Sequence, residues 1–341
     1  MPLWLALAVF VISALAVGRL GAALAQSGDA LADRTGLGRV FVGTLLVAVV
    51  TSLPEVATDV TAAVAGSPDL AVGDLFGSSM ANMAILAIID LRYRRRVWPL
   101  AGLVHARVAA IAILLTALAI LGVLTPPGVS LGWVGLDTIM IGGLYVAAVA
   151  WFRRMPSLTR PGDPCVQTEA VGLLEPIDLE RTPHAPTMRS LVARFALAGL
   201  GILIAAPVLS LAAKAIAEAS GVDETFLGAT LLAITTSLPE LVVALAAVRI
   251  GAHDLAVGNL FGSNMVNMAV LLLVDLAYVD GPLLAAVDPS QVVAGIGAIV
   301  LMALAVAVLV GGSETRIRRL EPDAIVMLVA YVGAIIAIAV T

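Results

Sequence analysis

Two short stretches of the sequence combine residue types that could bind a cation inside an apolar environment. TSLPE occurs at residues 51–55 and again at 236–240, so that Glu55 and Glu240 each follow a proline within a long apolar run. Proline removes a helical hydrogen bond, and a freed carbonyl in hydrocarbon must find a partner or line a polar cavity. A carboxylate inside a membrane is costly and marks a functional site by default. The pattern therefore predicts two polar helix breaks within a membrane.

Oxygen-bearing side chains at helical spacing accompany each glutamate. Residues three and four positions apart share a helix face, and hydroxyl, amide and carboxylate oxygens are hard ligands that suit Ca²⁺ and Na⁺. The three histidines lie at helix ends or in a linker and there is one cysteine, which speaks against a zinc or copper site. The candidate side chains are Thr51, Ser52, Glu55, Ser78 and Asn82 in the first half, and Thr236, Ser237, Glu240, Ser263 and Asn267 in the second.

Structural explanations compete with this interpretation. Ser and Thr in membrane helices often bond to their own backbone, Asn can join two helices, and proline kinks are common. Two glutamates at equivalent positions are harder to explain in this way, because we expect no Lys or Arg in the middle of a span to pair with them. The G-x-x-x-G spacings Gly73/Gly77 and Gly258/Gly262 predict close helix packing.

The composition indicates a membrane protein built from helices. The chain of 341 residues is 61% hydrophobic and 13% charged, whereas a soluble domain is about a quarter charged. A span needs about 20 apolar residues, and the first run is expected to be a mature helix, not a signal peptide. Ten such runs are found, at residues 3–26, 40–65, 70–91, 99–124, 132–152, 191–219, 226–249, 255–278, 289–311 and 322–341. We therefore expect an all-α membrane protein with ten transmembrane helices.

The positive charges predict the orientation of these helices. Connectors counted first, third, fifth and ninth along the chain carry arginines, such as Arg34, Arg95, Arg153 and Arg318, and Arg249 lies beside the seventh. The even connectors carry neither Lys nor Arg. By the positive-inside rule the odd connectors are cytoplasmic, which makes both termini extracytoplasmic. We expect a multi-pass protein of the cell (inner) membrane.

The sequence is also an internal repeat. A shift of 185 residues brings 51–55 onto 236–240 and 69–91 onto 254–276, with 16 of the latter 23 positions identical. The predicted units are a five-helix repeat at 1–152, a cytoplasmic linker at 153–190 and a second repeat at 191–341. Because five is odd, the two repeats must be inverted across the membrane, which is typical of transporters with a site at the repeat interface.

These motifs identify a resemblance. TSLPE followed by G-x-L-F-G-S-x-x-x-N, present twice and inverted, resembles the repeats of the cation/calcium exchanger superfamily, and most of all its compact prokaryotic Na⁺/Ca²⁺ exchangers. The resemblance implies a secondary antiporter, not an enzyme, that moves Ca²⁺ and Na⁺ without a cofactor. It implies that the ten candidate side chains bind the ions together with the carbonyls of Ala48 and Ala233, and that the first helix of each repeat slides across a rigid core.

Two departures leave alternatives open. Asn267 stands where many prokaryotic relatives carry aspartate, so the site has two formal negative charges, which puts the ion stoichiometry in doubt. Asp59 lies one turn after Glu55, and the repeat has Ala244 at the matching position. Asp59 is a candidate proton or cation relay, or a vestibule residue. A Ca²⁺/H⁺ antiporter is the main alternative, because burial favours a protonated carboxyl, and a cation channel is a distant one. The expected partners are the lipid bilayer and the ions, with no nucleic acid and no inferable protein partner.

Overall fold

The computed structural model describes residues 2–92, 103–126, 128–154, 187–220, 236–311 and 322–340. This part of the chain is almost entirely helical. The long helices are α1 (Leu3–Thr35), α5 (Pro68–Arg92), α6 (Leu103–Leu124), α7 (Leu136–Arg154), α9 (Met188–Ser220), α12 (His253–Ala277), α14 (Val292–Gly311) and α15 (Pro322–Val340). The shorter helices are α2 (Arg39–Phe41), the π-helix η1 (Val42–Val47), α3 (Ala48–Thr51), α4 (Leu53–Val64), α11 (Leu238–Arg249), α13 (Leu283–Ala286) and the 3₁₀-helix η3 (Pro289–Gln291).

The helices that could cross a membrane agree with the predicted runs. Eight described helices are long and apolar enough to span a bilayer, and the pair Arg39–Thr51 and Leu53–Val64, bent by 44°, would make a ninth. The predicted run at 226–249 is described only through α11, because residues 221–235 lie outside the described part. The all-α membrane class is therefore confirmed, while the count of ten helices stays a prediction.

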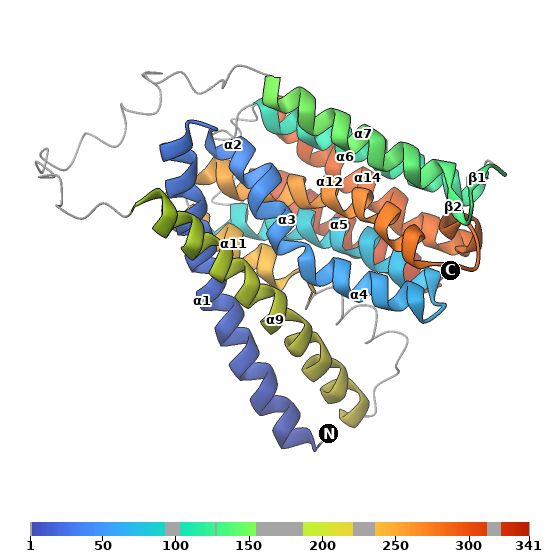
Figure 1. The fold of residues 1–341 in the computed structure, drawn as a ribbon, viewed down its shortest axis with the longest axis horizontal. Coiled ribbons are helices and arrows are strands. Elements are labelled where there is room, and N and C mark those ends of the chain that lie inside the picture. The colour runs from blue at the N-terminus through green and yellow to red at the C-terminus, as the bar shows by residue number, and fades with distance from the viewer. Residues whose placement is uncertain are drawn as a thin grey trace, which may run out of the picture.

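The helices form two groups that differ in direction. In Figure 1, α1 and α9 run side by side and slant steeply away from the other long helices, which lie roughly along the horizontal. These two helices pack against each other along much of their length. Most of α5 and α12 is buried, and these two helices contact each other and their neighbours α4, α6 and α14. The centre of the protein is thus built on α5 and α12.

One short β-hairpin was not predicted. The strands β1 (Ser130–Leu131) and β2 (Val134–Gly135) pair antiparallel just before α7, where the sequence predicts a helix from residue 132. Gly132 adopts a left-handed conformation with φ of 68°, which only glycine adopts easily, and this turn reverses the chain. Asp275 at the end of α12 accepts hydrogen bonds from the Gly135 and Leu283 backbone N–H groups at 2.8 and 2.7 Å and from the Thr138 hydroxyl, which gives it a structural role.

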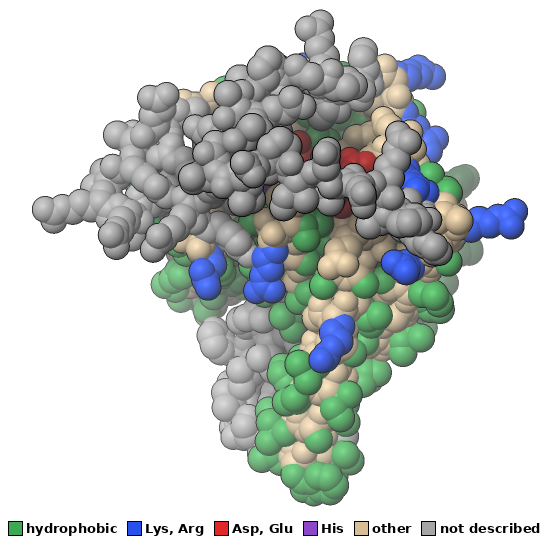
Figure 2. Space-filling model, turned by 90° about the vertical axis from the view of Figure 1, so that its left-hand side faces the viewer, with side chains coloured by type: hydrophobic (Ala, Val, Ile, Leu, Met, Phe, Trp, Pro, Cys, Tyr) green, Lys and Arg blue, Asp and Glu red, His purple; other side chains and the backbone are tan. Residues whose placement is uncertain are grey.

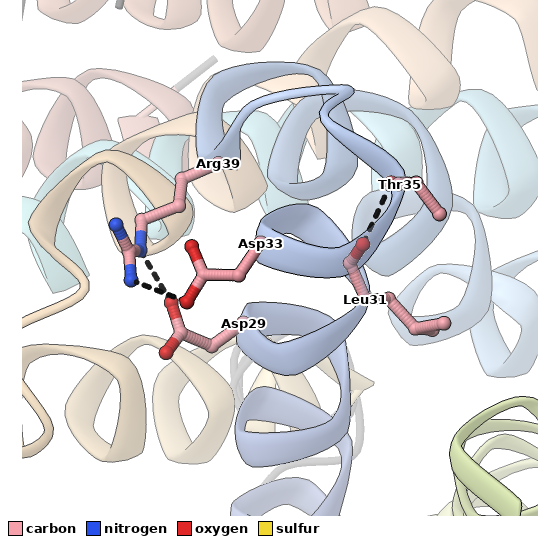
Figure 3. A network of polar contacts seen from close by, with 5 residues as sticks. All are labelled: Asp29, Leu31, Asp33, Thr35 and Arg39. Carbon is pink, nitrogen blue, oxygen red and sulfur yellow. Dashed lines mark hydrogen bonds and ion pairs between the residues drawn. The ribbon is translucent and has the colours of Figure 1, made fainter. Parts of the chain in front are cut away.

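The turn from α1 into α2 is fixed by a small polar network. In Figure 3 the Arg39 guanidinium reaches back to Asp29 and Asp33, both on the last turns of α1. The Thr35 hydroxyl donates to the Leu31 carbonyl at 2.6 Å, and Gly36 ends α1 with φ of 69°. Because these ion pairs are partly exposed, each contributes at most about 1 kcal/mol. Their main effect is to set the direction in which α2 leaves α1.

The surface separates charged from apolar side chains. Figure 2, which looks at the left-hand side of Figure 1, shows Lys and Arg side chains gathered on that face and apolar side chains over the helices that extend below it. Large apolar residues such as Ile12, Leu197 and Val329 are exposed on α1, α9 and α15, as expected for helices that face lipid. Helix α1 extends to Thr35, beyond the predicted run at 3–26, so that Arg19 lies at the centre of this helix.

Candidate ion-binding site

The first TSLPE segment forms a break in a transmembrane helix. Helix α3 ends at Thr51, Ser52 has φ of −84° and ψ of 0°, and α4 starts at Leu53 with Pro54 in its first turn. Proline is tolerated in a first turn, where its missing N–H would have no helical partner. The bend of 44° therefore follows from the proline, and it places Glu55 at the start of a helix.

The second TSLPE segment adopts the same local conformation. Ser237 has φ of −82° and ψ of 4°, and α11 starts at Leu238 with Pro239 in its first turn. This sparsely populated backbone region often holds residues of active sites. Glu240 is again in the first turn, where the positive end of the helix dipole favours a carboxylate. The two equal sequences thus adopt the same backbone conformation at Ser52 and Ser237 and each start a helix directly after it.

Side chains from the two breaks meet at Glu240. The hydroxyls of Ser52 and Ser263 each donate to Glu240 Oε1 at 3.4 Å, and Glu55 is close enough to Glu240 to interact electrostatically. The Thr51 hydroxyl lies 3.5 Å from that of Ser263. Glu55 and Glu240 are almost fully buried. The structure therefore brings residues that are about half the chain apart into one polar cluster.

The asparagines join α5 to α12 at the same level. Asn82 donates its amide to the Asn264 side-chain oxygen at 2.9 Å, and Asn267 donates to the Ser79 hydroxyl at 3.4 Å. Asn264 in turn donates to the Ser79 carbonyl at 3.3 Å. Because the amide nitrogens of Asn82 and Asn267 make these bonds, their side-chain oxygens remain available as acceptors or ligands.

Several buried oxygens of the cluster have no hydrogen-bond partner among the described residues. Buried polar atoms are normally bonded, so a group of such oxygens in one place fits a site for cations. No three His, Cys, Asp or Glu side chains of the described ranges form a metal-binding group, so carboxylates alone do not make this site. The unpartnered oxygens are Glu55 Oε2, Glu240 Oε2, Ser78 Oγ, Ser237 Oγ, Asn82 Oδ1 and Asn267 Oδ1.

Of the two backbone carbonyls that the resemblance implies as ligands, the structure describes one. The Ala48 carbonyl accepts from the Thr51 hydroxyl at 3.1 Å and from the Ser52 N–H at 3.0 Å, so it lies directly beside the cluster. Ala233 lies outside the described residues. Thr236 is buried at the start of the described segment.

Close helix packing around the cluster explains one of the glycine pairs. A Cβ atom on Gly258 would lie 3.1 Å from the Val40 carbonyl oxygen, and one on Gly262 would collide with the Thr44 backbone. A Cβ on Gly43 would lie 2.6 Å from the Leu255 carbonyl oxygen. The π-helix η1 and α12 thus approach backbone to backbone, as the G-x-x-x-G spacing in the second half predicts. π-helical segments are frequent at functional sites.

Asp59 and Asp74 form an acidic extension of the cluster. Both are buried, both interact electrostatically with Glu55, and they interact with each other. The carboxyl group of Asp59 also makes a hydrogen bond with that of Asp74. The count of two formal charges near the site is therefore incomplete, since two further carboxyl groups lie close by.

The sequence reasoning did not single out Asp74, Ser79, Asn259 or Asn264. Asn259 accepts a hydrogen bond from the Thr51 hydroxyl at 3.2 Å, and Asn264 and Ser79 bond to the two predicted asparagines. A signal was present, because Asp74 aligns with Asn259 and Ser79 with Asn264 in otherwise matching segments. Of these four residues, Asn259, Ser79 and Asn264 each bond to the other half of the chain.

The chain is similar to known proteins over most of its length. A family model described as sodium/calcium exchanger protein matches residues 5–152 and 190–340. The chain is 31% identical over 312 residues to the CaxA protein of Alkalimonas amylolytica, with 89% of each chain covered. It is 29% identical over 271 residues to the inner membrane protein YrbG of Escherichia coli (strain K12). This match covers 79% of this chain and 78% of YrbG.

The fold is also similar to that of a solved structure. The sodium-calcium exchanger NCX_Mj superposes with a TM-score of 0.72, with 20% identity and 98% of each chain covered. This likeness extends over the long helices and both halves of the chain. From the match to the family model over most of its length, the chain belongs to the sodium/calcium exchanger protein family.

Proposed function

We propose that this protein is a secondary active antiporter that exchanges Ca²⁺ for Na⁺ by alternating access at the buried cluster. The observation that carries the proposal is that Glu55 and Glu240, from opposite halves of the chain, lie in one buried group of oxygens. The name sodium-calcium exchanger of NCX_Mj and the family match support Ca²⁺ and Na⁺ as the transported ions.

Competition for the glutamates would couple the two fluxes. Two carboxylates in a medium of low polarity repel each other, and a bound cation relieves that repulsion. Ca²⁺ and Na⁺ would use the same carboxylates, so occupancy by one ion excludes the other. The proposed ligands are Thr51, Ser52, Glu55, Ser78, Asn82, Thr236, Ser237, Glu240, Ser263 and Asn267, with the carbonyls of Ala48 and Ala233.

The proposed topology has ten helices in two inverted five-helix repeats, 1–152 and 191–341, joined by a cytoplasmic linker at 153–190. The equal backbone conformations of Ser52 and Ser237 and the arginine-rich face in Figure 2 support it. Both termini would then be extracytoplasmic, in the cell (inner) membrane. The steep pair α1 and α9 (Figure 1) is the candidate for the sliding element, since it lies across the other long helices at a different angle.

A Ca²⁺/H⁺ antiporter is the second candidate function. The buried carboxyl groups of Asp59 and Asp74 favour it, because they lie next to Glu55 and could exchange protons with it. In this case Asp59 would relay protons to the cluster.

One transport experiment distinguishes the two functions. The protein is reconstituted into proteoliposomes, and Ca²⁺ uptake is measured under an outward Na⁺ gradient at equal pH on both sides. The same uptake is then measured under a pH gradient without Na⁺. Ca²⁺/Na⁺ exchange predicts uptake only in the first condition, and uptake driven only by the pH gradient would overturn it in favour of Ca²⁺/H⁺ exchange.

A further inference from the structure

A groove between α1 and α11 lies apart from the ion cluster. It has a volume of about 470 Å³ and a floor of small and apolar side chains, among them Ala14, Gly18, Leu245 and Ala246. Gly21, one turn further along α1, approaches Val242 so closely that a Cβ atom would lie 2.8 Å from its methyl group. The groove is therefore the opening beside a tight crossing of two helices.

Two arginines line this apolar groove. Arg19 comes from the centre of α1 and Arg249 from the end of α11, and both side chains are exposed. Within the described ranges neither arginine has a salt bridge or hydrogen bond. No acidic side chain of those ranges lines the groove. Among the described residues, the groove thus combines an apolar floor with two arginines that no acidic side chain neutralises.

This combination fits one class of ligand. A basic residue inside a membrane span is costly unless it finds a partner, and a guanidinium binds a phosphate through two parallel hydrogen bonds. Basic pockets between transmembrane helices are known to bind anionic lipid headgroups. We propose that the groove binds an anionic phospholipid, whose phosphate lies between Arg19 and Arg249 and whose acyl chain lies on the apolar floor.

A lipid fits better than a soluble phosphate because of the surroundings of the groove. Leu15, which also lines it, is 56% exposed, and the neighbouring Ile12 on α1 is exposed as well. A ligand that enters from the bilayer would cover these apolar side chains, whereas a free anion would leave them as they are. The proposal does not depend on which ions the protein exchanges.

The test measures lipid binding to the purified full-length protein in detergent by native mass spectrometry. Phosphatidylglycerol and phosphatidylcholine of equal chain length are titrated separately. The wild type should bind phosphatidylglycerol more tightly. Arg19→Gln and Arg249→Gln should each weaken this binding about fivefold, the factor that corresponds to roughly 1 kcal/mol per arginine. Arg19→Lys and Arg249→Lys should retain most of it, and Arg154→Gln at the exposed end of α7 serves as the charge-matched control.

Three kinds of result would overturn the proposal. The first is a lack of specific lipid binding, seen either as equal affinity for the two lipids or as phosphatidylglycerol binding that the double Gln variant leaves unchanged. The second is full competition by glycerol phosphate, which would indicate a site for soluble anions. The third is a lipid-free dimer that the double variant dissociates, since the groove would then hold a second copy of the chain. Because ion transport is not measured, failure here would leave the proposed exchange untouched.

Discussion

The two halves of the chain have the same backbone conformation before their glutamates but different acidic neighbours. Ser52 and Ser237 share one backbone conformation, and a glutamate follows each. Around them the first half has Asp59 and Asp74, where the second half has Ala244 and Asn259. The positions that match supply the central oxygens, whereas the positions that differ add carboxyl groups on one side only. The residues that the two halves share thus form the cluster, and the residues that differ place additional carboxyl groups only on the side of the first half.

The contacts between the halves follow the same rule. Asn82 bonds to Asn264, and Asn267 bonds to Ser79. These two contacts are related by the repeat, because Asn82 matches Asn267 and Asn264 matches Ser79. The same contact forms in both directions although the accepting residue is Asn264 in one case and Ser79 in the other. A hydroxyl and an amide oxygen can both accept the bond, which explains why this difference is tolerated.

The largest effect is expected from removing a matched carboxylate. Glu55→Gln and Glu240→Gln should each reduce Na⁺-driven Ca²⁺ uptake to background, because each removes one of the two charges at the centre of the cluster. Stability should not fall, since an uncompensated charge within a membrane is costly. Asp280→Asn, in the exposed loop after α12, is the control for loss of an acid. Exchange at the wild-type rate by either glutamine variant would refute the shared site.

A smaller effect is expected from the asparagines. Asn82→Ala and Asn267→Ala should each weaken Ca²⁺ binding about tenfold, because each removes an oxygen from the cluster and a buried hydrogen bond between α5 and α12, at a cost of roughly 1–3 kcal/mol. Isothermal titration calorimetry gives the affinities. Asn264→Ser, which copies Ser79 of the other half, should change the affinity much less. Unchanged affinity in both alanine variants would mean that these asparagines only pack the helices.

Glycine-to-alanine substitutions in the two halves should differ in their effect on the stability of the protein. A Cβ on Gly262 would collide with the backbone of Thr44, whereas one on Gly73 would meet the end of the Gln291 side chain, which can move away. Gly262→Ala should therefore destabilise the protein by about 1–3 kcal/mol, and Gly73→Ala should cost less. Thermal unfolding in detergent measures both. Equal melting temperatures for the two variants would contradict the backbone contact between η1 and α12.

The smallest effect on exchange is expected when the first half is made to copy the second. The double variant Asp59→Ala with Asp74→Asn removes the acidic extension and leaves the ten proposed ligands in place. Na⁺-driven Ca²⁺ uptake should stay within about threefold of wild type, since a change of less than roughly 1 kcal/mol is expected from groups outside the ligand set. Any uptake driven by a pH gradient should disappear. Loss of Na⁺-driven uptake would make the two aspartates part of the ion site.

Much of the fold could be predicted from the sequence, for reasons that particular residues make clear. Apolar runs of about 20 residues have few alternatives in a membrane, and Pro54 and Pro239 fix the two helix breaks. The hairpin before α7 was missed because the start of the run at 132–152, with Trp133 and Val134, reads as apolar, while the reversal depends on the φ of a single glycine, Gly132.

The cluster was harder to predict in full. Spacing along one helix places Thr51, Ser52 and Glu55 on one face, and the resemblance adds the residues of the following helix. Spacing cannot indicate that Thr51 meets Asn259 or that Asp59 meets Asp74, because these contacts depend on how two helices cross. The length of α1 was also underestimated, since the polar and charged residues after Gln26 do not interrupt a helix that packs along α9.

The central claim is that both halves build one site that Ca²⁺ and Na⁺ share, and direct binding tests it. Ca²⁺ is titrated by calorimetry into the purified protein at increasing Na⁺ concentrations, for the wild type, Glu55→Gln and Glu240→Gln. The account predicts a single Ca²⁺ per wild-type chain, an apparent affinity that falls steadily as Na⁺ rises, and no measurable Ca²⁺ binding in either variant. Ca²⁺ binding that Na⁺ does not displace, or that persists in one of the two variants, would contradict a single shared site.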